Sequence, residues 1–228
     1  MNRKHKAFIA YALACSALVL SFALWTRVLA GREAESSADA GILHNVAAEN
    51  RDDRGSSSSD KYRKEERAEL SQWGLTQRYE LTIPSLSVRA PVFVPERKYW
   101  NAEEWDLLEQ QMQVGLSYGV VTYPHGVPPG ERGTLIIAGH SSPPDERAAK
   151  HSFGKVFEKL PDLTIGAEIT VRFGTTSVTY EVADTMIVSP GDTSILAQQK
   201  DESLLKLITC YPIGSVKDRL VIIAKKKS

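Results

Sequence analysis

Three residues of this sequence carry the side chains that acyl transfer needs: His140, Cys210 and Arg219. A thiolate attacks a carbonyl carbon, and an imidazolium near it can protonate a leaving amine and later deprotonate an incoming one. A guanidinium, which is always charged and presents several donors, can hydrogen-bond a substrate or a developing oxyanion. Together the three residue types predict a cysteine-based acyl transfer reaction.

The positions of these residues along the chain favour that interpretation over three separate structural roles. Cys210 and His140 each end an apolar run typical of a strand, and Arg219 opens the last such run, at 220–224. If the strands that bear Cys210 and Arg219 are antiparallel neighbours, both residues lie at the same end of the sheet. Taken singly, each residue could be structural: a small buried thiol, a surface histidine, or an arginine paired with Asp218.

Residues 1–30 are expected to form an N-terminal transmembrane anchor. A basic cluster at 3–6 precedes an uncharged run from Ala7 to Trp25, which is long enough to cross about 30 Å of hydrocarbon as a helix. The basic cluster favours a cytoplasmic N-terminus, so the rest of the chain would be extracytoplasmic. A cleaved signal peptide that ends near Ala30 is the alternative, and it would export the domain equally.

This expected location also bears on Cys210. Thiols outside the cytoplasm normally pair as disulfides. The second cysteine of the chain, Cys15, falls inside the expected anchor. Cys210 is therefore expected to be a free, reactive thiol rather than one half of a disulfide.

Composition argues against several other classes of function. The 28 Lys and Arg residues balance 28 Asp and Glu residues, so no basic surplus is present to neutralise the phosphates of a nucleic acid. The sequence shows no metal-ligand spacing, and we expect neither a metal nor another cofactor. His125 and His151 are expected to lie in loops, exposed to solvent.

Residues 31–77 are expected to form an extracytoplasmic polar tether. The segment is rich in charged and small residues and includes Ser56 to Ser59, a composition that cannot bury enough apolar surface to offset its ordering entropy. Lys61 to Leu70 favours a short helix, because its residue types have high helix propensity. Trp73 and Leu75 are expected to dock the end of the tether onto the domain.

Residues 78–228 are expected to form one mainly β domain. Short apolar runs separated by turn residues predict strands at 79–83, 88–94, 134–138, 168–173, 177–188, 204–209 and 220–224. One helix is expected from Asn101, where Asn101 and Glu104 match a capping box and an apolar stripe follows at Trp105, Leu108, Met112 and Leu116. Many short strands with one or two short helices predict a closed or nearly closed β-barrel.

With these features the chain resembles the sortases, a family of membrane-anchored cysteine transpeptidases. The resemblance lies in Gly119 to Pro124, Leu135 to His140, Ser152 to Gly166, Asp192 to Leu196, and Leu207 to Cys210 with Arg219 and Leu220. The family signature, a strand end of the type Thr-x-Thr-Cys, is only partly present, because Leu205-Lys206-Leu207 stands in the place of its first threonine. The resemblance covers residues 78–228 and implies a closed eight-stranded barrel.

The resemblance also implies a reaction and the residues that perform it. A sortase cleaves a sorting signal of the Leu-Pro-x-Thr-Gly type between Thr and Gly, forms a thioacyl-enzyme, and transfers the acyl protein to an amine. Cys210 is thereby implied as the nucleophile, His140 as the acid and base, and Arg219 as the ligand of substrate and oxyanion. Ile195 and Leu196 are implied as apolar contacts for the signal, unless they pack beneath their own loop.

The implied partners are secreted proteins with a C-terminal sorting signal, an amine acceptor on a cell-wall precursor or protein subunit, and the membrane. The spacing of Cys210, Pro212, Gly214 and Arg219 resembles the pilus-assembling sortases. Those enzymes usually carry a second, C-terminal membrane span and a lid with an Asp-Pro-aromatic anchor. This sequence reaches Ser228 without a second apolar span and has no Asp-Pro pair in the tether, so we expect an anchoring enzyme.

Other interpretations of the same residues stay open. A thiol hydrolase or protease would use them with water as the acceptor. The L,D-transpeptidases also use Cys and His, but they place an arginine two residues after the cysteine, where this chain has Pro212. A non-catalytic, exported β-barrel binding module would bury Cys210 and would not need it for function.

Overall fold

The computed structural model describes residues 54–227 of the chain. The chain divides into two units between Glu65 and Glu66, and the second unit contains the barrel. The expected anchor at 1–30 and the first part of the expected tether lie outside the described residues. Within residues 54–227, no helix is both long and apolar enough to cross a membrane.

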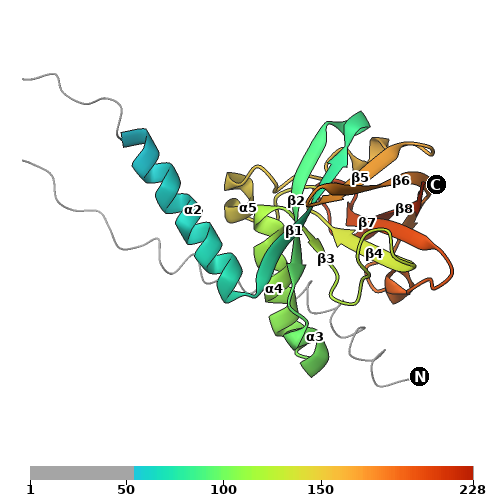
Figure 1. The fold of residues 1–228 in the computed structure, drawn as a ribbon, viewed down its shortest axis with the longest axis horizontal. Helices are drawn as coiled ribbons and strands as arrows, with labels where there is room; N and C mark the ends of the chain where they lie inside the picture. Colours follow the sequence, from blue (N-terminus) through green and yellow to red (C-terminus); the bar gives the residue numbers. More distant parts are fainter. Residues whose placement is uncertain (1–53, 228) are drawn as a thin grey trace, which may run out of the picture. The chain divides into compact units, whose positions relative to one another are not determined.

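Eight strands form a closed barrel in the order β1-β2-β3-β4-β7-β8-β6-β5, which confirms the expected closed eight-stranded barrel (Figure 1). The pairing of β1 with β5 closes the barrel, and the β2–β3 and β4–β7 pairs are parallel. The strands are β1 (Leu75–Ile83), β2 (Val88–Pro95), β3 (Val120–Thr122), β4 (Gly133–Ala138), β5 (Glu168–Phe173), β6 (Thr176–Val188), β7 (Ser203–Tyr211) and β8 (Asp218–Lys226).

Side chains on β4 and β7 alternate between the inside and the outside of the barrel. Ile137 and Leu207 point inwards and belong to the large buried cluster that fills the barrel. Ile136 and Ile208 point outwards and belong to a separate cluster, which includes Ile195 from the β6–β7 loop. The β6–β7 loop therefore covers part of the outer face of these two strands.

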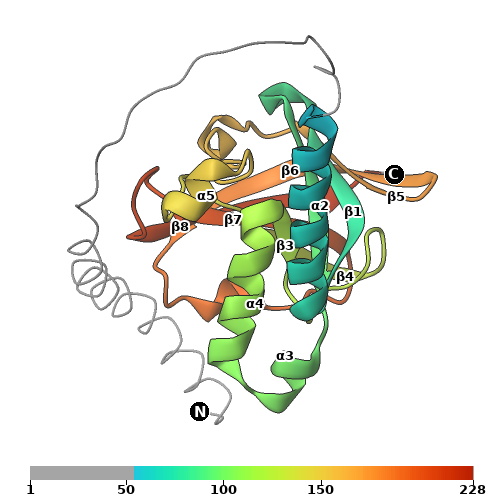
Figure 2. The same ribbon diagram turned by 90° about the vertical axis from the view of Figure 1, so that its left-hand side faces the viewer.

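The helices are α2 (Arg54–Gln72), α3 (Lys98–Ala102), α4 (Trp105–Tyr118) and α5 (Glu146–Lys150), with 3-10 turns η1 (Pro84–Leu86), η2 (Leu160–Asp162) and η3 (Thr193–Leu196). Figure 2 shows α4 standing against the outer side of the barrel. Its residues Leu108, Met112 and Leu116 are buried against Phe93 and Val121 of β2 and β3. The apolar stripe predicted for this helix is therefore confirmed.

The expected start of that helix at Asn101 is wrong. Asn101 lies inside the short helix α3, which ends where Glu103 adopts a left-handed conformation with φ 58°. Glu104 then precedes α4 without a side-chain capping bond. The five-residue α3 and the 14-residue α4 thus replace one continuous helix, because the left-handed residue Glu103 interrupts the helical backbone before the apolar stripe begins.

The end of α2 docks onto the barrel unit as expected. Leu70 is 7% exposed and Leu75 is 5% exposed, and both join the cluster between α4 and β2. Gln111 Nε2 of α4 donates to the carbonyl oxygen of Trp73 at 2.7 Å. The helix is longer than the predicted Lys61 to Leu70, and β1 already begins at Leu75, before the expected domain boundary at 78.

Candidate active site

The structure brings Cys210 and Arg219 directly opposite each other. The two residues are register partners in the antiparallel ladder between β7 and β8. On the other side of β7, the parallel ladder with β4 runs as far as the pair Ala138 and Ile208. His140 follows two positions after Ala138, as Cys210 does after Ile208, so the three residues form one row, with His140 just beyond the end of β4, Cys210 on β7 and Arg219 on β8.

Hydrogen bonds keep the chain beside β7 after β4 has ended. Gly139 N donates to Ile208 O at 3.1 Å, and Thr209 Oγ1 donates to Gly139 O at 2.8 Å. Ser141 Oγ then donates to Cys210 O at 2.8 Å. Thr209 is 3% exposed and Ser141 is 2% exposed, so both hydroxyls act in a dry environment where such bonds fix geometry. The turn that carries His140 is therefore attached to the strand end that carries Cys210.

The row faces the outside of the barrel. Ile208 on β7 and Val221 on β8 point outwards, and alternation gives Cys210 and Arg219 the same orientation. Tyr211, the next residue on β7, packs against the inner cluster, as this alternation requires. The Cys210 thiol is free and only partly buried. The side chain of Cys210 is therefore accessible from outside the barrel.

His140 is 9% exposed and sits between the end of β4 and the segment that leads to α5. Burial lowers the pKa of His140, while the carboxylates of Asp145 and Glu109 act in the opposite direction. The neutral imidazole is therefore favoured at neutral pH. Its backbone is held from the other side by Phe157, whose N–H donates to His140 O at 2.8 Å.

Arg219 is held by the β7–β8 loop. Its Nη1 donates to the carbonyl oxygens of Val216 and Asp218, each at 3.0 Å. Asp218, which the sequence offered as an ion-pair partner, thus contributes a backbone carbonyl here. Because Nη1 is the nitrogen that makes both bonds, the rest of the guanidinium fork remains available for a ligand.

The β6–β7 loop forms the wall beside the row. Asp192 Oδ1 caps η3 by accepting from Ser194 N at 2.9 Å. Ile195, 8% exposed, packs down against Ile208, and Leu196 is half-buried next to it. Of the two apolar residues predicted to contact a signal, Leu196 therefore reaches the surface, whereas Ile195 lies beneath its own loop.

His125 was expected to be solvated, and that expectation is wrong. Its ring stacks on Trp100 with centroids 4.7 Å apart, and its Nε2 lies 2.8 Å from Leu196 O. Burial lowers the pKa of His125, so the neutral ring donates from Nε2 to that carbonyl. The sequence gives no signal for this contact, because the two partners are far apart in the chain and meet only when the barrel closes.

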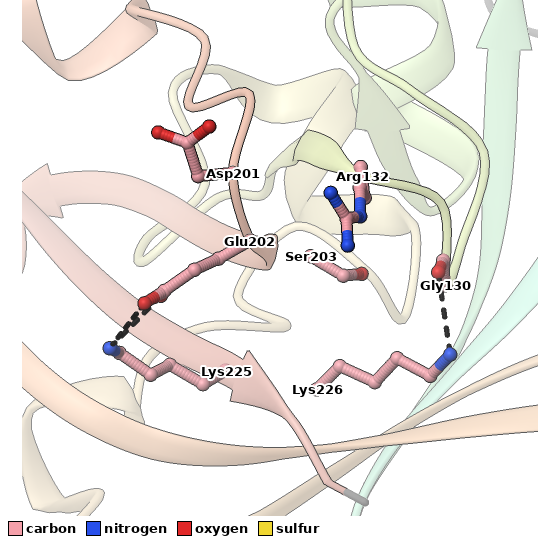
Figure 3. Close-up of a pocket in the computed structure, with 7 residues that line it drawn as sticks. All are labelled: Gly130, Arg132, Asp201, Glu202, Ser203, Lys225 and Lys226. Atoms are coloured by element: carbon pink, nitrogen blue, oxygen red, sulfur yellow. Dashed lines mark hydrogen bonds and ion pairs between the residues drawn. The ribbon is translucent and has the colours of Figure 1, made fainter.

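A pocket at the opposite end of the barrel carries a different chemistry (Figure 3). Its lining residues are Gly130, Arg132, Asp201, Glu202, Ser203, Lys225 and Lys226. Lys225 Nζ lies 2.9 Å from Glu202 Oε2, and Lys226 Nζ donates to Gly130 O at 3.4 Å. Ser203 starts β7 and Cys210 lies near its other end, which separates this pocket from the row by about 20 Å. In residues 54–227, no group of three or more acidic, His or Cys side chains could hold a metal ion.

The fold and the site together define the class of protein: a closed, mixed β-barrel with a free thiol, an imidazole and a guanidinium in one row at the end of three neighbouring strands. The Sortase domain matches residues 81–227, and the chain belongs to the sortase family. Sortases as a family are cysteine transpeptidases that act on sorting signals.

Individual relatives show how far the similarity extends. The chain is 30% identical to Sortase D of Bacillus subtilis over 114 residues, which are 49% of this chain and 52% of that protein. The chain thus spans about half the length of that curated relative. The fold is similar to Sortase A from Corynebacterium diphtheriae, with a TM-score of 0.54, 20% identity, and coverage of 68% of this chain and 62% of that one.

Two further solved structures share the fold. Sortase C-1 from Actinomyces oris has a TM-score of 0.54 and 22% identity, with coverage of 71% of this chain and 81% of that chain. The Sortase D5 transpeptidase of Clostridium perfringens has a TM-score of 0.52 and 22% identity, with coverage of 76% and 95%. Relatives of several sortase types are therefore comparably similar in fold, and the fold alone does not assign the type.

Proposed function

We propose that this chain is a transpeptidase that cleaves a signal of the Leu-Pro-x-Thr-Gly type between Thr and Gly and transfers the acyl protein to an amine. The observation that carries the proposal is the row formed by His140, Cys210 and Arg219. In it the thiol lies between the other two groups, on the exposed face of the barrel. Acyl transfer needs this order, because the nucleophile must have both a proton carrier and an oxyanion ligand within reach.

In the first step, Cys210 and His140 act as a pair. The neutral imidazole, which burial favours, takes the thiol proton, and the Sγ thiolate attacks the Thr carbonyl carbon of the signal. Arg219 donates to the oxyanion as the carbonyl π pair moves onto oxygen. When the C–N bond breaks, the imidazolium gives its proton to the leaving glycine amine, and a thioester remains on Cys210.

In the second step, an amine attacks the thioester carbonyl. His140 removes a proton from the attacking nitrogen, the C–S bond breaks, and Cys210 leaves as a thiolate that is protonated again. No group is consumed and no external oxidant, metal or cofactor is required. The same residues would hydrolyse the thioester if water replaced the amine, and the two outcomes differ only in the product.

Leu196 and the outer face under η3 are proposed to receive the apolar part of the signal. Leu196 is half-buried at the edge of the outer cluster, and Ile195 supports it from below. A contact of Ile195 with the signal stays a prediction that requires the loop to open. The proposed partners are secreted proteins with such a signal and an amine acceptor on a cell-wall precursor or a protein subunit.

We propose an extracytoplasmic location for the barrel, with the N-terminus in the cytoplasm and membrane attachment through the apolar run at 7–25. The type of sortase is proposed to be an anchoring enzyme. In support of this, residues 70–75 pack beside α4 and β2 rather than with the outer cluster beside Cys210.

This proposal is tested with the full chain in detergent. The protein is incubated with a library of quenched Leu-Pro-x-Thr-Gly peptides, with and without an added amine, and the products are identified by mass spectrometry. We expect an amine-linked product that disappears in Cys210→Ala and persists in Cys15→Ala, a matched control at the other cysteine. Hydrolysed product alone would favour the thiol hydrolase. A Cys210 that yields no product and resists alkylation in the folded protein would favour the binding module.

A further inference from the structure

A buried ammonium lies on the outer face of β7, under the loop that walls the candidate site. Lys206 is only 7% exposed, although the strand position is on the outside of the barrel. Its Nζ donates to Ile195 O at 2.7 Å and approaches Ala197 O at 3.4 Å. Both acceptors are backbone carbonyls at the end of η3. The side chain thus crosses from the barrel wall to the loop.

The surroundings of Lys206 show that barrel packing alone does not call for a lysine there. Its register partners on the two neighbouring strands are Ile136 and Ile223, and the outer cluster around it is apolar. Removing an ammonium from water is unfavourable unless acceptors replace its hydration. Burial also lowers the pKa of Lys206. The compensation comes from the β6–β7 loop, so the function of the charge is connected with that loop.

The same loop is attached at its other residues as well. Thr134 N donates to Gln198 Oε1 at 2.8 Å, and Gln198 Nε2 donates to Thr134 O at 3.1 Å. His125 binds Leu196 O from the β3–β4 loop. Among these attachments, Lys206 is the one on β7, the strand that carries Cys210. It therefore links the position of the loop to the position of the nucleophile.

We propose that Lys206 is a positioning residue that holds the 195–197 segment in the conformation that receives the apolar residues of a sorting signal. The inference rests on the proposed function and deepens it. Leu196 lies between the two carbonyls that Lys206 binds, so fixing them sets the height and orientation of Leu196 above the outer face of β7. A loop held in advance costs less ordering entropy when a flexible peptide binds.

The substitution Lys206→Met tests this proposal, because it keeps an unbranched apolar stem and removes only the ammonium. Lys225→Met is the matched control, since it removes the same charge from the neighbouring strand at the far end of the barrel. Hydrogen exchange of the amides at 193–199 reports on the loop without any substrate. Peptide cleavage by the full chain gives KM and kcat separately.

In Lys206→Met we expect faster exchange across 193–199 and a KM raised about tenfold, with kcat within about threefold of the parent. The unfolding temperature should not fall, because a buried charge is replaced by an apolar side chain of similar length. Lys225→Met should match the parent in exchange at 193–199 and in KM. This combination separates loop positioning from a general contribution to stability, which would lower the unfolding temperature first.

Unchanged exchange at 193–199 in Lys206→Met, or faster exchange with an unchanged KM, would overturn the proposal. If Lys206→Met does not fold, Lys206→Gln, which retains a donor, takes its place. Failure of both to fold would assign Lys206 to the core instead. If the parent protein turns over no peptide at all, the proposed function is wrong, whereas the exchange measurement still decides whether Lys206 holds the loop.

Discussion

The substitution Gly139→Ala is expected to inactivate the site by displacing the backbone that positions His140. It does not alter any side chain that takes part in the chemistry. A Cβ at Gly139 would lie 2.5 Å from Cδ2 and 2.6 Å from Cε2 of Phe157. Both distances are about 1 Å shorter than an ordinary carbon–carbon contact. Phe157 is 1% exposed and packed in the barrel core, so the ring cannot move out of the way. The backbone at 139 must therefore move.

That movement disturbs the contacts that place His140. Gly139 N and O are bonded to Ile208 O at 3.1 Å and to Thr209 Oγ1 at 2.8 Å, and a shift of the turn stretches both bonds. Overpacking of this kind costs about 1–3 kcal/mol of stability. A displacement of about 1 Å at a reacting group can cost about 100-fold in rate. We therefore expect kcat to fall by about two orders of magnitude, and the unfolding temperature to fall by several degrees.

Thermal unfolding of Gly139→Ala measures the expected fall in unfolding temperature, and peptide turnover by the same variant measures the expected fall in kcat. Gly191→Ala is the matched control, because a Cβ there meets nothing within 4 Å. The double variant Gly139→Ala with Phe157→Leu should recover part of the lost kcat. Its kcat should be higher than the value expected if the two substitutions acted independently. Parent-like kcat and unfolding temperature in Gly139→Ala would refute the argument that this close approach positions His140.

Three further changes probe the row and the hydrogen bond that supports it. Arg219→Lys should lower kcat about 100-fold, because one ammonium cannot both bind the loop carbonyls and face an oxyanion; a near-normal rate in the peptide assay would remove Arg219 from the proposed site. Burial places the pKa of His140 below its unfolded value, so the unfolded state binds more protons and stability falls as pH drops below about 6.5. His140→Gln should make the unfolding free energy in urea less dependent on pH between about 5 and 7, and an unchanged slope would contradict this reasoning. Thr209→Val should cost about 1–3 kcal/mol in urea, because it leaves the carbonyl of Gly139 without its buried donor; a loss below a few tenths of a kcal/mol would show that the bond is not needed.

The sequence predicted the barrel well where side-chain alternation was strong. Seven of the strand positions followed from short apolar runs, and the antiparallel pairing of β7 with β8, on which the shared position of Cys210 and Arg219 depended, is confirmed. β3, at 120–122, was not among the predicted strands, because a segment of this length carries too little alternation to be recognised. The capping box at Asn101 gave the wrong helix start because the left-handed conformation of Glu103 ends α3 there, and α4 begins only at Trp105.

The residue types of the candidate site were predictable from the sequence, but the hydrogen bonds and ring contacts that hold those residues in place were not. His140 and Cys210 stood out because each follows an apolar run, which is a local feature. The bonds from Thr209 and Ser141 that join the two strand ends depend on the parallel pairing of β4 with β7. The stack of His125 on Trp100 depends on closure of the barrel in the same way. Such contacts have no periodic pattern in the sequence, since their partners are distant along the chain.

The run Leu205-Lys206-Leu207, at the start of which no signature residue lies, illustrates how one residue gains meaning only in three dimensions. In the sequence, a lysine between two leucines in a buried strand is an inconsistency, because a strand with both faces covered should be apolar throughout. In the structure, Leu205 and Leu207 point into the barrel, and Lys206 points outwards under η3. Burying the ammonium on the strand costs desolvation free energy, whereas its hydrogen bonds to the carbonyls of the loop hold the loop in place. Local inconsistencies of this kind tend to mark functional positions, and here the position lies on the strand that presents Cys210.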